Sequence, residues 1–179
     1  MSNSNEMMKV TLTLNGKQAE VEFSKEQLVA LGLVEEKKTG YERVEPGKDY
    51  WCVVSSGDAM PWVDNHTIYG DAIYELANYY SDKTVAENNA RADKLMCQLR
   101  RFAAENGGIP SVEDWKDRSI NKYYIRYDYD NGKLRFDAML TWRDSFQIYF
   151  KSKEACKKAI EEFKDELLWY FTEYQAMLY

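Results

Sequence analysis

The chain has little of what most catalytic and metal-binding sites are built from. Its 179 residues include one histidine, His66, and three cysteines. A single histidine excludes a histidine-based metal cluster. Cys52, Cys97 and Cys156 lie far apart without a zinc-motif or disulfide-framework spacing. We therefore expect buried free thiols in a reducing compartment and no cofactor.

Other signatures are missing as well. No apolar run approaches the roughly 18–20 residues of a membrane-spanning helix, and the polar first residues lack the parts of a signal peptide. Asn106-Gly107-Gly108 follows a predicted helix, whereas a phosphate-binding loop precedes one. Residues 128–132 lack the glycine and glutamate spacing of a calcium loop. We expect a cytoplasmic protein that is not an enzyme.

Aromatic residues, by contrast, are abundant at 15% of the chain, with 14 tyrosines. They mark a folding unit that occurs twice. Residues 50–54 open the first copy and residues 123–127 the second. Each copy continues through a turn to an aromatic strand end, at residues 78–80 and 148–150, and then to a polar residue and a long helical stretch. Such repetition predicts the architecture before any residue is given a role.

The predicted fold class is α+β, with two repeated antiparallel β units that are each followed by a covering helix. An N-terminal hairpin is predicted around Asn15-Gly16, followed by a short helix that begins after the capping-box residue Ser24. The predicted organisation is residues 1–48 for the hairpin, short helix and connector, 49–108 for the first repeat, and 109–179 for the linker and second repeat.

One acidic segment stands out in a chain of net charge −6. Residues 50–82 contain five acidic residues and no lysine or arginine. We expect a longer loop at residues 56–70 than at the matching turn of the second repeat, and loops commonly carry specific contacts. The alternative is an ordinary polar sheet face whose aromatic side chains point into the core. The predicted partner-binding residues are Asp58, Trp62, Asp64, His66, Tyr69 and Asp71.

A second candidate surface lies on the first long helix, where four basic residues gather. Arg91, Lys94 and Arg101 fall at helical spacing, with Arg100 beside them. Such a cluster is able to contact phosphate. Because the cluster is small and acidic residues lie close by, a solvated helix face is the favoured explanation.

The repeat unit resembles a known group of small phage and prophage proteins from Firmicutes-type hosts. The second copy carries the resemblance best, with Tyr123-Tyr124-Ile125, Asn131-Gly132 and residues 149–155. Residues 41–51 look similar too, and the resemblance covers roughly residues 41–174. The first copy departs from the pattern after Ser81, where the Glu-Ala pair is missing.

Some proteins of this group are anti-CRISPR proteins, which disable the host's RNA-guided nuclease. The resemblance therefore implies a phage-derived inhibitor that binds a type II CRISPR effector nuclease and blocks DNA binding or cleavage, with a secondary contact to DNA or guide RNA. The shared positions are those that make the fold, so the resemblance assigns no functional residue. A nucleic-acid-associated accessory module and a phage structural or assembly protein stay open as alternatives.

Overall fold

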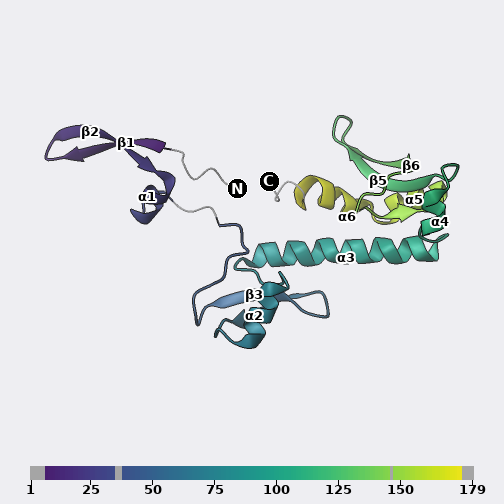
Figure 1. Cartoon of the computed structure of the whole chain (residues 1–179), viewed down its shortest axis with the longest axis horizontal. Coiled ribbons are helices and arrows are strands. Elements are labelled where there is room, and N and C mark those ends of the chain that lie inside the picture. The colour runs from purple at the N-terminus through teal and green to yellow at the C-terminus, as the bar shows by residue number, and fades with distance from the viewer. Residues whose placement is uncertain (1–6, 35–37, 146, 175–179) are drawn as a thin grey trace. The chain divides into compact units, whose positions relative to one another are not determined.

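The computed structural model describes residues 7–34, 38–145 and 147–174, and the chain divides into two compact units, Met1–Glu42 and Arg43–Tyr179 (Figure 1). Small antiparallel sheets and helices make up both units, so the predicted α+β class is confirmed.

The N-terminal unit is a two-stranded hairpin followed by one short helix. Strands β1 (Met7–Leu14) and β2 (Lys17–Ser24) pair in antiparallel register. Asn15 and Gly16 have φ values of 50° and 75° at the turn, as a tight hairpin with two positive-φ positions requires. Ser24 caps α1 (Lys25–Ala30) in the predicted capping box.

The second unit begins with the first repeat. Strands β3 (Asp49–Val53) and β4 (Ala59–Val63) form an antiparallel hairpin, and Tyr80 makes an isolated antiparallel bridge to Trp51 on the other side of β3. The Asp82 side chain then caps α3 (Lys83–Glu105). A helix therefore follows the third strand position, as the repeat predicted.

The second repeat has the same order. Strands β5 (Lys122–Asp128) and β6 (Lys133–Met139) form a hairpin, and β7 (Tyr149–Phe150) pairs with the opposite side of β5. The Ser152 side chain caps α5 (Lys153–Glu162), as Asp82 caps α3. The repetition read from the sequence is thus present in strand order, pairing and capping.

The two repeats differ at another place than expected. Residues 56–70 do not form a long loop, because the first hairpin turns within residues 54–58 and β4 follows directly. The extra length of the first repeat instead lies after β4, where α2 (Ile68–Glu75) is inserted before the Tyr80 bridge. The predicted excursion is therefore a strand and the start of a helix.

Three details of the second half also differ from the sequence prediction. The strand end expected at residues 148–150 is the two-residue strand β7. The long continuous helix is interrupted at Phe163, where α5 ends before α6 (Lys164–Trp169) and a π-helical turn, η1 (Tyr170–Tyr174). The linker contains α4 (Val112–Lys116), from which Trp115 packs edge-on against Tyr149 with ring centroids 4.9 Å apart.

Two apolar clusters form the interior of the second unit. The smaller comprises buried residues of β3 and of the segment around α2: Tyr50, Cys52, Ile73 and Tyr79. The larger joins the C-terminal half of α3 to the second repeat, with Leu95, Leu99 and Phe102 among its buried members. Helix α3 contacts both repeats (Figure 1). Cys52 and Cys156 are buried, but Cys97 is exposed on α3, which corrects the expectation of three buried thiols.

Candidate protein-interaction surface

A buried carboxylate organises the segment that follows β4. Asp64 has no exposed surface, although it was predicted to contact a partner. Its Oδ2 accepts hydrogen bonds from Arg43 Nε and Tyr79 Oη, both at 2.9 Å, and its Oδ1 accepts one from the backbone N–H of His66 at 2.8 Å. A buried charge is tolerated when it is paired and hydrogen-bonded in this way. Asp64 is therefore a structural residue.

The electrostatics of this cluster follow from its contacts. The hydrogen bond from the Arg43 guanidinium holds the pKa of the Asp64 carboxyl well below its usual range. Burial raises the pKa of Tyr79 to about 12, so its hydroxyl stays protonated and donates to Asp64. The same hydroxyl accepts a hydrogen bond from the Val44 N–H at 3.2 Å, which joins the start of the unit to the cluster.

Arg43 also reaches α2. Its Nη1 lies 2.6 Å from Asp71 Oδ1, and its guanidinium carbon lies 5.6 Å from the centre of the Tyr74 ring. Thr67 caps the helix by accepting from the Gly70 N–H, and Ile73 packs into the smaller core. One arginine from outside the acidic segment thus joins the loop after β4 to the inserted helix.

Three apolar residues lie on the outward side of α2, with the exposed Glu75 beside them. Ile68 is 90% exposed and Leu76 is 78% exposed, and Ala72 between them is also exposed. Residues at these i, i+4 and i+8 positions share one face of a helix, opposite the buried Gly70 and Ile73. Surface helices ordinarily turn such a stripe toward the core, so its exposure here requires an explanation.

Two aromatic residues extend the stripe. Tyr69 on α2 is 62% exposed, and its ring centroid lies 6.0 Å from that of Trp62 on β4, which is 44% exposed. Trp62 lies opposite Tyr50 in the register and shares the sheet face on which α2 packs. We call the five exposed residues the α2 surface: Trp62, Ile68, Tyr69, Ala72 and Leu76.

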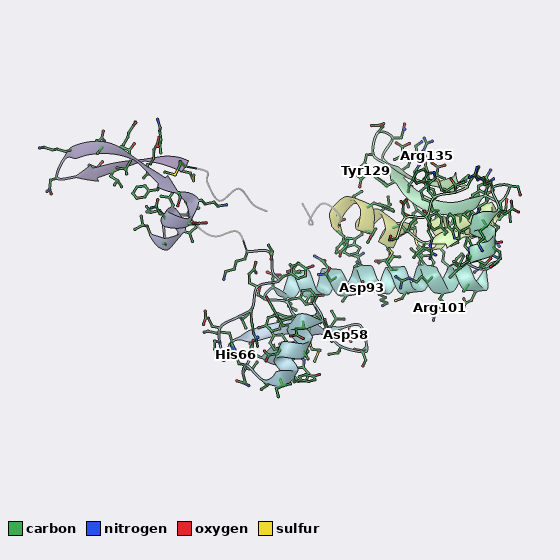
Figure 2. The ribbon with its side chains drawn as sticks, viewed as in Figure 1. Asp58, His66, Asp93, Arg101, Tyr129 and Arg135 are labelled. Atoms are coloured by element: carbon green, nitrogen blue, oxygen red, sulfur yellow. The ribbon has the colours of Figure 1, made fainter. Side chains whose placement is uncertain are left out.

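The structure brings together only part of the predicted partner-binding set. Trp62 and Tyr69 meet, and Asp71 lies on α2 with its carboxylate bound by Arg43. His66 is exposed in the loop before α2 with a left-handed φ of 49°, whereas Asp58 lies at the hairpin turn at the other end of β4 (Figure 2). Sequence reasoning missed Ile68, Ala72 and Leu76, although their four-residue spacing is a helical signal. Only Ile68 lies within residues 56–70, which were predicted to form a loop.

The acidic character of this region is weaker than the sequence indicated. Arg43 lies outside residues 50–82 but pairs with both Asp64 and Asp71, so these three residues together carry one net negative charge. Asp58, Glu75 and Asp82 are the remaining exposed acids of the segment. The α2 surface is therefore an apolar and aromatic patch beside Glu75. Tyr50 and Tyr79, two other aromatic residues of the acidic segment, lie in the core, as the alternative interpretation held.

The basic residues of α3 do not form one patch. Arg91 is held by Glu166 of α6, with Nε 2.8 Å from Oε2, and its guanidinium stacks 3.9 Å from the centre of the Trp169 ring. Arg100 borders a cavity that Asp93 also lines, and Arg101 borders a different one. Lys94 and Arg101, seven residues apart, share a face, and Arg101 points away from the second sheet in Figure 2.

No group of three histidine, cysteine, aspartate or glutamate side chains among the described residues is arranged to hold a metal ion. None of the helices described has both the length and the apolar character needed to cross a membrane.

Comparison of the chain with models of protein families, with curated protein sequences and with solved structures found no match.

Proposed function

We propose that the protein acts by binding another protein through the α2 surface, and that it carries out no reaction of its own. The observation that supports the proposal is the apolar stripe of Ile68, Ala72 and Leu76, which faces solvent beside Trp62 and Tyr69. Contiguous exposed apolar patches on small proteins commonly mark interaction sites.

The patch has the composition of a binding hot spot. Tryptophan and tyrosine side chains supply large contact areas and are enriched among the residues that dominate binding energy. The Asp64 cluster and the Thr67 cap hold α2 in place, so little ordering is required when a partner binds. A rigid aromatic and apolar patch favours slow dissociation.

The proposed partner is a type II CRISPR effector nuclease, which the protein would inhibit stoichiometrically. This choice rests on the resemblance to phage proteins. Such a nuclease holds its nucleic acids in a positively charged channel. The exposed acid Glu75 at the end of α2 suits a basic partner surface beside an apolar contact, because opposite charges speed association.

The test titrates this protein into a guide-loaded type II nuclease and measures cleavage of plasmid DNA. We expect inhibition that saturates near one equivalent. The double variant Ile68→Ser with Leu76→Ser is expected to weaken inhibition at least about tenfold, because two exposed apolar contacts are lost without any change in the core. Val112→Ser, at a 62% exposed position on α4, is the matched control.

The possible outcomes distinguish an error in the proposed contact surface from an error in the proposed partner. Full inhibition by the double variant would show that the α2 surface is not the contact. An absence of inhibition across several type II nucleases would remove the proposed partner. Charge reversal at Asp64 and Asp71 is unsuitable here, because it removes both acidic partners of Arg43 and disrupts the fold around α2.

A further inference from the structure

A cavity of about 360 Å³ lies where four segments of the second unit meet. These segments are α3, the linker through α4, the loop between β6 and β7, and η1. Its described lining is partly apolar and aromatic, and it includes three charged side chains, Asp93, Arg100 and Arg143. Sites for small ligands have this volume and combine an apolar body with a few polar groups in the same way.

One wall of the cavity is a single face of α3. Asp93, Met96 and Arg100 line it at i, i+3 and i+7 positions, which lie on the same side of a helix. Asp93 is near the middle of α3 (Figure 2). Since each residue of a helix adds about 1.5 Å, Asp93 and Arg100 are separated by about 10 Å along the axis. An acceptor and a cation therefore stand two turns apart, with an apolar side chain between them.

The two arginines of the cavity have no acidic partner in the part of the chain that the structure describes. Four other arginines of the second unit form salt bridges, but no carboxylate oxygen of the described residues lies within 4.0 Å of Arg100 or Arg143. Asp93 likewise makes no salt bridge there. Both arginine side chains are exposed, and each guanidinium carries five N–H donors. They are therefore able to bind an anion that arrives from solvent.

A buried lysine joins two of the walls. Lys122 has no exposed surface, and its Nζ donates to the backbone carbonyls of Asp117 at 2.8 Å and of Leu140 at 3.0 Å. These bonds connect the linker to the start of the loop that carries Arg143. The same Nζ lies 5.3 Å from the centre of the Trp115 ring, which lines the cavity. The linker wall and the loop wall are thus held at a fixed separation.

Further hydrogen bonds position the lining. Tyr149, against which Trp115 packs, accepts a hydrogen bond on its hydroxyl from the Asp144 N–H at 3.1 Å. This contact fixes the backbone next to Arg143. Gln147 also lines the cavity, and its Nε2 donates to the Ile125 carbonyl at 3.1 Å. Since these contacts exist without a ligand, little ordering is required when one binds.

We propose that this cavity binds a nucleoside monophosphate whose base carries an amino group. The phosphate has a charge of about −2 at pH 7 and pairs with the guanidinium groups of Arg100 and Arg143, which match phosphate oxygens with parallel N–H donors. Aromatic side chains such as Trp115 suit a planar base. The amino group of the base donates to Asp93, at the other end of the α3 wall. The proposed site shares no residue with the α2 surface.

The test uses the full chain and isothermal titration calorimetry. We expect saturable binding of cytidine monophosphate, and at least about tenfold weaker binding of cytidine, because the charge-assisted hydrogen bonds to the phosphate are lost. Uridine monophosphate has the same size but carries an oxygen in place of the amino group. It is expected to bind at least about fivefold more weakly than cytidine monophosphate, because it presents an acceptor to the Asp93 carboxylate.

Three variants test the charged residues. Arg143→Gln is expected to weaken cytidine monophosphate at least about tenfold and to change the affinity for cytidine less than about twofold. Arg118→Gln is the matched control, because Arg118 is exposed in the linker, does not line the cavity and makes no salt bridge with the described residues. Asp93→Asn is expected to bring the affinities for the cytidine and uridine monophosphates close together, since an amide both donates and accepts. If a variant fails to fold, the three ligands on the unaltered protein decide alone.

A short single strand shows where the nucleotide comes from. A cytosine hexanucleotide that displaces cytidine monophosphate at a concentration at least about tenfold lower would assign the site to one unit of a strand, because further bases add stacking contacts. A hexanucleotide that needs a higher concentration would assign it to a free nucleotide.

Four results would overturn the proposal. One is no saturable binding of cytidine monophosphate up to about 1 mM. The second is equal binding of cytidine, which would show that the arginines do not hold the phosphate. The third is equal binding of uridine monophosphate, which would remove the role of Asp93. The last is an equal loss of affinity in Arg143→Gln and Arg118→Gln, which would show general attraction to positive charge in place of a site.

Discussion

At the scale of single residues, Asp64 shows how burial changes the meaning of a charge. In the sequence it is one of five acids in a segment without basic residues. In the structure Arg43, Tyr79 and the His66 N–H surround it. Arg43 precedes it by 21 positions, so no local pattern connects them. Whether an acid of this segment is exposed is decided by a tertiary contact.

We expect Asp64→Asn to lower the free energy of unfolding by about 2 kcal/mol, because it removes the charged partner of Arg43 and leaves the buried site incompletely paired. Urea denaturation followed by tyrosine and tryptophan fluorescence measures this. Asp58→Asn is the control, since Asp58 is exposed and its carboxylate accepts a hydrogen bond from the hydroxyl of Ser56 within the same turn. A comparable loss there would contradict the assignment.

The same pair predicts a pH dependence. Because the pKa of Asp64 is lowered in the folded state, its carboxylate adds stability above the unfolded-state pKa, roughly 3.9. That contribution is lost as the pH falls toward the folded-state pKa. The difference in unfolding free energy between the unaltered protein and Asp64→Asn is therefore expected to be constant from about pH 7 to about pH 5 and to shrink below about pH 4. A difference that grows on acidification would contradict this.

At the scale of elements, turn and capping motifs in the sequence predicted the turns and helix starts that depend on contacts between neighbouring residues. The Asn15-Gly16 turn and the Ser24 capping box appear in the structure as expected. The polar residues expected before the two long helical stretches are Asp82 and Ser152, and each caps its helix. Each rests on hydrogen bonds within a few residues.

The sequence did not predict helix α2, because its pattern of apolar residues is not that of a helix packed on a core. Its eight residues include Gly70, and its apolar stripe faces solvent, so its pattern of buried residues does not follow the usual rule. The Trp62 and Tyr69 contact follows from the position of this helix, which is why the sequence predicted the two residues but not the surface they belong to.

Gly70→Ala is expected to raise the free energy of unfolding by about 0.5 kcal/mol. Alanine favours the helical conformation, and a Cβ at this position would lie 3.6 Å from Asp64 Oδ1 and 3.7 Å from Thr67 Oγ1, which are ordinary contacts. Gly57→Ala is the matched control; its φ of +86° strains any other residue, so this variant is expected to be destabilised. Thermal unfolding of both variants checks the signs, and a loss of stability in Gly70→Ala would contradict the packing described for α2.

At the scale of the whole molecule, the chain divides at residues 42 and 43. The sequence prediction ended the N-terminal part at residue 48, where the connector meets the first strand. Arg43 and Val44 belong with the following unit because both bond the Asp64 and Tyr79 cluster. The amino-acid composition of the connector does not reveal that Arg43 and Val44 contact residues of the following unit.

Two truncations test this boundary. A chain that begins at Arg43 is expected to keep the unfolding midpoint of the second unit, because that unit retains its cores and the Asp64 cluster. A chain that begins at Glu45 is expected to unfold at a lower temperature, because Asp64 loses Arg43. Calorimetry measures both midpoints, and equal midpoints would show that Arg43 does not stabilise the unit.

The position of helix α3 limits how recombination can exchange parts of this chain. As the covering helix of the first repeat it also supplies Leu95, Leu99, Phe102 and Ala103 to the larger core, four of its ten buried members. A recombination event that replaced the first repeat as a block would therefore also replace part of the interior of the second. The boundary for exchange therefore differs from the boundary of the repeats, and viable recombinants are expected to exchange α3 together with the second repeat.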